Sequence, residues 1–496
     1  MNQLQVSSQT LQQLLERCAQ SSDFVTTSIN LPDQQLTISY YKTLIDEKLL
    51  QYHVILPMQD RGREEKLEQL EHIRAWVPID DIEITYEVDT VQAKLLCGSI
   101  MIQIDKSSLP CALVNIPNML GLRDSNDTEN EFSVVGPKVG FVEDIHTNIR
   151  LIRALIKVPN LVVREITIGS LSQTKVALLY LEGVTNKQYI DTMEQRLRDI
   201  DFELVFDSSQ LDEIMCDNTW TPFPLFLSTE RRDRVVYALI SGQVAVISDG
   251  SPYFVTGPST LFDFFISPED YYLPWMIGSF FRMIRIFGVF FSLFATAMYV
   301  AITTYHYEVV PKDLLGPLIY SRQNVPFSPL IEVLFLEITV EFLREAGARL
   351  PSRIGQTLGI VGGIILGQAA VEAALTSNVL IIIVALSALA SFATPIYKMS
   401  NTIRFLRFPI IILAASWGGI GMFFGIGFIL VHITRLTSLG SPYMLPAFPL
   451  RVTDLRDSFI RSSYQWLNRR PQYLRTGAPT RYTPKVVQRK HELDDE

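Results

Sequence analysis

The chain has 496 residues, 48% of them hydrophobic and 19% charged, and a formal net charge of −9. This length allows three or four domains, and the acidic balance gives no indication of a nucleic-acid partner. The four cysteines form no Cys-x-x-Cys pair and the six histidines no pair at metal-ligand spacing, so neither a disulfide framework nor a metal site is expected. The amino terminus lacks a basic start followed by an apolar core, so no cleaved signal peptide is expected.

The sequence before residue 281 predicts two α/β subdomains, at 1–130 and 131–280. In the first, the patterns predict helices at 10–19 and 63–76 and strands at 36–41, 93–104 and 111–116. The polar stretch 123–131 is interpreted as a surface loop or linker. In the second, they predict helices at 143–156, 187–200 and 233–240 and strands at 161–168, 175–181 and 243–248. The order of the strands in the sheets stays open.

Residues 281–440 are predicted to form a helical membrane domain. Four nearly uncharged runs approach the roughly 20 residues that a spanning helix needs, namely 286–304, 357–376, 379–396 and 409–433. Arg282 and Arg285 precede the first run and favour a cytoplasmic N-terminal region. Lys398, Arg404 and Arg407 favour a cytoplasmic loop between the third and fourth runs. The number of crossings stays open, because 330–343 could also cross.

The last section, 441–496, is rich in arginine and is predicted to be a cytoplasmic tail. Its prolines argue against a packed core. Two interpretations are open: the tail lies against anionic lipid, or it is a solvated flexible segment.

The second apolar run carries two different faces in helical projection. Small residues at four-residue spacing, which allow close helix contacts, are Gly359, Gly363 and Gly367. The opposite face carries Val361, Gln368 and Glu372, which suits a helix packed in an assembly beside an aqueous path. Alternatively, Glu372 simply reaches the membrane interface near the end of the helix.

A second candidate is the acidic stripe formed by Glu337, Glu341 and Glu345 at four-residue spacing. Repeated by symmetry, these carboxylates would make rings that attract cations. Alternatively, the helix lies in the interface with its charges in water. No nucleophile, general base or metal-ligand set accompanies them, so an enzyme is not expected.

Several segments resemble the A subunit of the GerA family of spore germinant receptors. They are GPKVGFVEDIHTNIRLIR at 136–153, EGVTN at 182–186, VAVISDGSP at 244–252, FDFFISPEDYY at 262–272, LEITVEFLREAGARLP at 336–351, residues 355–372, and GSPYMLPAFPLRVTDLRDSFIR at 440–461. The chain departs from the resemblance at Arg232, where proline is expected.

The resemblance implies a cytoplasmic two-part α/β region, a multi-pass membrane bundle and a short cytoplasmic tail in the inner spore membrane. It also implies a homo-oligomeric ring around an ion path, a membrane B subunit, a lipoprotein C subunit, a small nutrient as ligand and no cofactor. Together with the helix pattern, it makes Val361, Gln368, Val371 and Glu372 the candidate pore-lining residues. A non-conducting receptor scaffold and a secondary transporter are the competing hypotheses.

Overall fold

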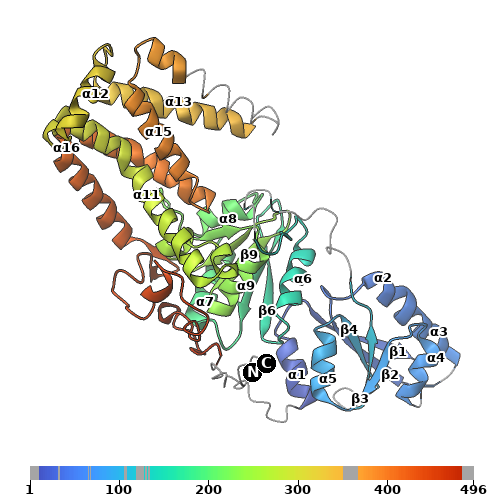
Figure 1. Cartoon of the computed structure of the whole chain (residues 1–496). Coiled ribbons are helices and arrows are strands. Elements are labelled where there is room, and N and C mark those ends of the chain that lie inside the picture. Colours follow the sequence, from blue (N-terminus) through green and yellow to red (C-terminus); the bar gives the residue numbers. More distant parts are fainter. Residues whose placement is uncertain are drawn as a thin grey trace, which may run out of the picture.

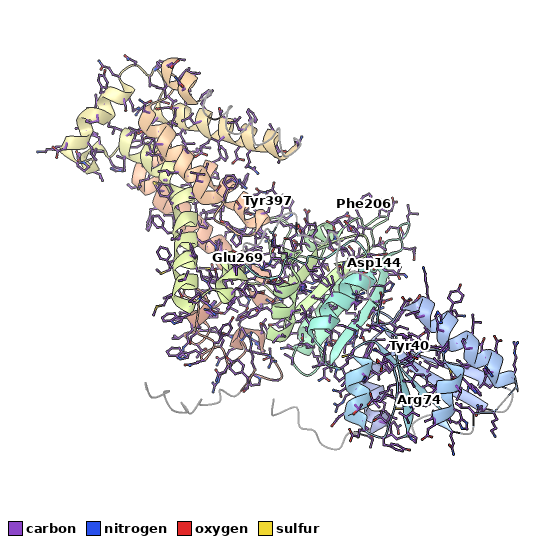
Figure 2. All side chains as sticks on the ribbon, turned by 45° about the vertical axis from the view of Figure 1, so that its right-hand side comes forward. Tyr40, Arg74, Asp144, Phe206, Glu269 and Tyr397 are labelled. Carbon is purple, nitrogen blue, oxygen red and sulfur yellow. The ribbon has the colours of Figure 1, made fainter. Side chains whose placement is uncertain are left out.

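Two α/β subdomains, a helical bundle and a C-terminal segment follow one another along the chain (Figure 1). Tyr40 and Arg74 lie in the first subdomain, Asp144 and Phe206 in the second, and Tyr397 at the base of the bundle (Figure 2). The computed structural model describes residues 10–31, 34–64, 66–67, 69–104, 109–118, 128, 131, 135–349, 363 and 367–482. The expected order, an α/β region followed by a helical region, is confirmed.

The first subdomain is an antiparallel five-stranded sheet of order β1-β2-β4-β5-β3 covered by helices. Its strands are β1 (Phe24–Leu31), β2 (Gln34–Tyr41), β3 (Ile82–Thr85), β4 (Ser99–Gln103) and β5 (Cys111–Asn115). Its helices are α1 (Leu11–Cys18), α2 (Glu47–Leu49), α3 (Leu56–Glu64), α4 (Ile73–Trp76) and α5 (Val88–Leu95), with a π-helical turn, Leu50–Ile55, before α3 and a 3-10 turn, Leu70–His72, before α4. Predictions at 10–19, 36–41 and 111–116 are confirmed.

Two predictions in this subdomain are wrong in extent. The expected helix over 63–76 does not form as one element, because α3 ends at Glu64 and α4 begins only at Ile73. The expected strand over 93–104 begins too early, since residues 93–95 close α5 and β4 starts at Ser99. Apolar residues at the end of an amphipathic helix and at the start of a strand look alike in a short window.

The second subdomain has a sheet of order β6-β7-β9-β10-β8, again antiparallel throughout. Its strands are β6 (Leu161–Ile168), β7 (Thr174–Leu181), β8 (Leu227–Thr229), β9 (Val244–Ser248) and β10 (Phe254–Gly257). Its helices are α6 (Ile145–Leu155), α7 (Lys187–Arg198), α8 (Ser208–Ile214), α9 (Arg232–Ser241) and the short α10 (Glu269–Tyr272), which follows a 3-10 turn, Leu261–Phe265. Every helix and strand predicted here is confirmed.

The two subdomains repeat one topology. Each begins with a helix and a β-hairpin. Further helices, one strand and one more helix follow, and then a second β-hairpin. Numbered within its own subdomain, each sheet has the order 1-2-4-5-3. The repeat was not visible in the sequence, because the same pleated faces are filled by different apolar residues.

A buried ion pair joins the subdomains. The guanidinium of Arg153, on α6, donates to both carboxylate oxygens of Asp23 at 2.6 and 2.7 Å and to Ser21 Oγ at 2.8 Å. The same guanidinium lies over the Tyr41 ring, 4.3 Å from its centre. Burial alone would raise the pKa of Asp23, but the charge and hydrogen bonds of Arg153 hold it below its ordinary value.

The helical region contains α11 (Trp275–Thr304), α12 (Lys312–Arg322), α13 (Pro329–Arg349), α15 (Asn378–Ser391) and α16 (Tyr397–Arg435). In the described part of the chain, α11 and α16 are long and apolar enough to cross a membrane. α15 runs antiparallel to α11, because Ser377 meets Tyr299 at 3.1 Å while Ser387 donates to the carbonyl of Ser292 at 3.1 Å. Of the predicted run 357–376, residues 357–362 and 364–366 lie outside the described residues.

The element α16 is a hairpin of two helices. Gly418 interrupts it with φ 60° and ψ −137°, and a Cβ added at Gly421 would lie 2.0 Å from the carbonyl oxygen of Leu413. The turn is capped by the two residues that follow α11: the Tyr305 hydroxyl donates to carbonyl oxygens freed by the interruption, and His306 accepts from the N–H of Gly419. The run 409–433 is therefore not the single crossing that was considered, and the chain returns toward the α/β region.

The glycine at the turn gives a matched pair of substitutions. The backbone angles of Gly418 are strained for any L-residue, so Gly418→Ala should destabilise the protein by about 1–3 kcal/mol. Gly427→Ala should be neutral or slightly stabilising, because a Cβ there meets nothing within 4 Å and alanine favours the helix by up to about 1 kcal/mol. Melting temperatures of the full chain in detergent measure both. Equal melting temperatures for the two variants would contradict the hairpin.

Residues 437–482 are not a solvated flexible tail, because they pack against the second subdomain (Figure 1). Contact of this segment with anionic lipid stays a prediction. Leu439, Leu445 and Leu474 are part of that subdomain's core. The Arg470 side chain donates to the carbonyl of Ile240 at 2.6 Å. The regular elements of this segment are short: the paired strands β11 (Thr437–Ser438) and β12 (Ser441–Pro442) and the 3-10 turns Leu455–Asp457 and Gln472–Leu474. Polar turns fixed by backbone contacts allow the rest of this proline-rich segment to pack.

Candidate functional site

Buried carboxylates tie the helices of the bundle together. Glu332, on α13, is fully buried and accepts hydrogen bonds from the backbone N–H of Ser377 at 2.6 Å and from the hydroxyl of Thr376 at 3.2 Å. The guanidinium of Arg322, on α12, forms an ion pair with Glu332 Oε2 at 3.4 Å. A charge at this depth requires such partners, because an unpaired one costs several kcal/mol.

Each residue of the predicted acidic stripe lies beside an arginine. Glu337 is buried against Arg407 of α16 at 2.5 Å, and Arg407 also donates to Ser292 Oγ of α11 at 2.6 Å. Glu341 pairs with Arg344, and Glu345 pairs with Arg349 within α13. The stripe thus changes along the helix from a fully buried position to an exposed one.

The sequence suggested that Arg404 and Arg407 lie in a loop, and this prediction is wrong. They lie on the first half of α16, and both are buried. Arg407 bridges α13 and α11 through its ion pair with Glu337. The sequence analysis missed this role and that of Glu332. An arginine at the edge of an apolar run with a glutamate in a neighbouring helix is the signal that was available.

Three of the four pore-lining candidates, Gln368, Val371 and Glu372, lie on a helical stretch at 367–372. Gln368 and Glu372 are exposed and joined by a hydrogen bond of 2.9 Å, whereas Ala370 is buried against the rest of the chain. Val371 is half-buried between these two faces. Val361 lies outside the described residues.

The helix-packing glycines are open in this single chain. A Cβ added at Gly363 or at Gly367 would meet no atom within 4 Å, among the residues that the structure describes. No packing partner within the described chain explains these glycines. Gly359 lies outside the described residues.

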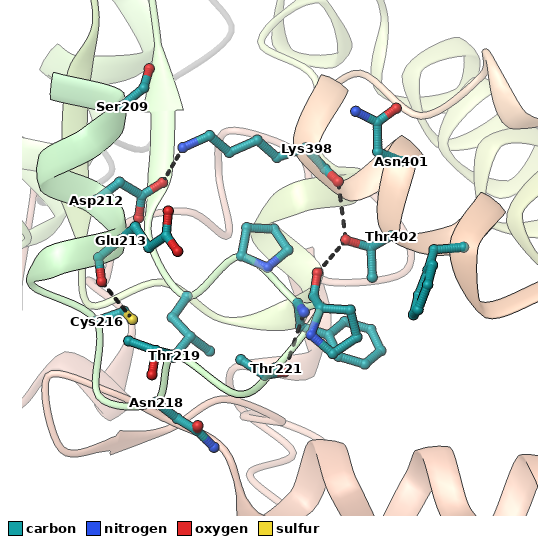
Figure 3. Close-up of a pocket in the computed structure, with 15 residues that line it drawn as sticks. Ser209, Asp212, Glu213, Cys216, Asn218, Thr219, Thr221, Lys398, Asn401 and Thr402 are labelled. Carbon is teal, nitrogen blue, oxygen red and sulfur yellow. Dashed lines mark hydrogen bonds and ion pairs between the residues drawn. The ribbon is translucent and has the colours of Figure 1, made fainter. Parts of the chain in front are cut away.

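A cavity of about 490 Å³ lies where the second subdomain meets the base of α16 (Figure 3). α8 and the loop after it form one wall, and the first turns of α16 form the other. Two hydrogen bonds fasten this junction: Thr402 donates to the carbonyl of Pro222 at 2.5 Å, and Thr221 meets His432 at 2.9 Å. Both arms of the α16 hairpin therefore contact one loop.

An ion pair crosses the cavity. The ammonium of Lys398 lies 2.5 Å from Asp212 Oδ2, which also accepts from the hydroxyl of Ser228. Burial of Asp212 raises its pKa, and the charge of Lys398 opposes that effect without cancelling it. No motif marked this site, since its residues lie far apart in the sequence. Among the described residues, no cluster of three His, Cys, Asp or Glu side chains is placed to hold a metal ion.

Comparison with known proteins identifies the family. The family described as Bacillus/Clostridium GerA spore germination protein matches residues 11–473. Spore germination protein GerQA of Bacillus cereus is 45% identical over 97% of this chain and 96% of its own length. Spore germination protein GerIA of Bacillus cereus is 44% identical over 98% of this chain and 72% of its own length.

A crystal structure of the N-terminal domain of the A subunit of the Bacillus megaterium spore germinant receptor GerK3 is also similar. It is 25% identical, covers 51% of this chain and 95% of that domain, and superposes with a TM-score of 0.40. The family match covers nearly the whole chain and agrees with the resemblance carried by the sequence segments. The chain therefore belongs to the GerA family of spore germination proteins.

Proposed function

We propose that this chain is the membrane A subunit of a nutrient germinant receptor and forms an oligomeric, ligand-gated cation channel in spores. Family membership supports a role in germination, and the apolar helix α11 and the apolar hairpin α16 support membrane association. Large apolar side chains on their outer surfaces are exposed, among them Phe287, Phe290, Phe424 and Phe428. Lipid is the environment that suits such surfaces.

The observation that carries the channel proposal is the exposed pair Gln368–Glu372. An ionised side chain facing lipid is costly, so within a membrane Glu372 requires protein or water beside it. The described part of this chain provides no cover for it beyond Gln368. A second copy packed on the open face of Gly363 and Gly367 would enclose the polar face around a shared aqueous path.

In this arrangement Val371 narrows the path and closes it by dewetting, while Glu372 favours cations. The α/β region is cytoplasmic, the membrane is the inner spore membrane, and a membrane B subunit and a lipoprotein C subunit complete the receptor. A small nutrient bound here or on a partner opens the path only through higher affinity for the open state.

The runner-up is a receptor scaffold without conduction of its own. It is favoured by the arginine beside each stripe carboxylate, because paired charges attract cations weakly.

A leak assay distinguishes the two. In non-sporulating cells that express the chain, Val371→Ser should raise the leak of monovalent cations severalfold over wild type, because a hydroxyl wets the constriction. Val431→Ser, the same change at an exposed position of α16, should leave the leak unchanged at matched protein levels. No leak from Val371→Ser, even with the partner subunits co-expressed, would favour the scaffold.

A further inference from the structure

The cavity at the base of α16 combines charged groups with apolar walls. The aromatic rings of Phe223 and Phe405 and the side chain of Leu225 supply apolar surface, and α8 supplies two carboxylates. Asp212 and Glu213 lie on one side of the cavity, opposite the first turns of α16 (Figure 3). A volume of about 490 Å³ accommodates one small molecule.

The lining of the cavity has two carboxylates, Asp212 and Glu213, and one ammonium group, Lys398. Lys398 and Ser228 both donate to Oδ2 of Asp212, which leaves Oδ1 without a donor among the described residues. The carboxylate of Glu213 has no hydrogen-bond or ion-pair partner in the described chain, since only its backbone carbonyl is bonded, by Cys216. The unmatched charge of the lining is therefore negative.

We propose that this cavity is a binding site for a small molecule that carries a protonated amine on an apolar body. An ammonium group has three donors and no acceptor. Glu213 and Oδ1 of Asp212 offer acceptors of opposite charge, and the apolar walls cover the body of the ligand. The inference goes beyond the proposed function and stands whether or not the chain conducts ions.

Lys398 would compete with a ligand amine for Asp212. Lys398 is itself an amine, and it occupies Asp212 from the second residue of α16. A ligand amine on Asp212 weakens that ion pair and so favours an arrangement in which α16 is released from α8. Binding and the position of α16 are then coupled by the difference in affinity between the two arrangements.

Calorimetry on the full chain in phosphatidylcholine nanodiscs tests the site with three four-carbon probes. Butylamine should bind saturably, whereas butanol and butyrate should not. Glu213→Gln should weaken butylamine binding about fivefold, because Glu213 is exposed and an exposed ion pair contributes modestly. Lys398→Met should strengthen it by removing the competitor. Glu16→Gln and Lys187→Met, at exposed remote positions, are the matched controls.

A repeat in nanodiscs that contain phosphatidylethanolamine identifies the source of the amine. Loss of butylamine binding there assigns the site to an aminolipid headgroup, and unchanged binding assigns it to a soluble amine. Either result supports an ammonium site. The proposal is overturned if wild type does not bind butylamine saturably in phosphatidylcholine, or if a folded Glu213→Gln variant binds it as tightly as wild type.

Discussion

Replacing Arg153 with methionine is expected to destabilise the first subdomain by about 3–5 kcal/mol. The substitution leaves the carboxylate of Asp23 buried without the guanidinium that donates to both of its oxygens. It also removes the cation over the Tyr41 ring. The matched control is Arg198→Met, which breaks an exposed ion pair with Glu194 and should cost at most about 1 kcal/mol.

Tryptophan emission during denaturation measures the effect, because Trp76 of the first subdomain is buried and the other four tryptophans are exposed. Removing both charges, in Asp23→Leu with Arg153→Met, should recover much of the loss. A double variant no more stable than Arg153→Met would mean that hydrogen-bond geometry, rather than unpaired charge, dominates.

The same pair predicts a pH dependence. The pKa of Asp23 in the folded protein is lower than its ordinary value of about 3.9. The stabilisation from its charged form is therefore complete above that ordinary value and is lost as the pH falls through the lower folded pKa. The difference in stability between wild type and Arg153→Met should shrink in acid, and a constant difference would exclude the ion pair as its cause.

Strands and helices of the second subdomain could be predicted because each combines a clear apolar period with a local start signal. α6, for example, begins after Asp144, whose side chain accepts from the N–H of Thr147. The hairpin in α16 could not be predicted in this way. Its turn depends on the backbone of Gly418, which lies inside a continuous apolar run, and on a hydrogen bond from Tyr305, which follows α11. Such tertiary contacts leave no periodic signal.

In the candidate site too, features that depend on local spacing could be predicted and contacts between distant residues could not. Spacing alone predicts a small-residue face and a polar face near Glu372, and their roles in packing and in a path stay predictions; in this chain Ala370 is buried and Gln368 is exposed. The pairing of Asp212 with Lys398 joins residues far apart in the chain. The stripe on α13 was visible as spacing, but its arginine from α16 was not.

The second large effect is expected from the pair Glu337–Arg407. Glu337→Leu alone should destabilise the full chain in detergent by about 3–5 kcal/mol, because it leaves a buried guanidinium with Ser292 as its remaining side-chain partner. Adding Arg407→Met should restore most of the stability. Thermal melting followed by size-exclusion chromatography reports both effects. Glu345→Leu, at the exposed end of the same stripe, should change the stability by about 1 kcal/mol or less.

This comparison also decides how the stripe takes part in conduction. If Glu337 is a structural partner of Arg407, the double variant should fold and keep the cation leak produced by Val371→Ser. If Glu337 instead attracts cations in an open state, the double variant should fold but lose that leak, since no carboxylate is left at this position. A Glu337→Leu variant as stable as wild type would remove the ion pair from the forces that hold α13 against α16.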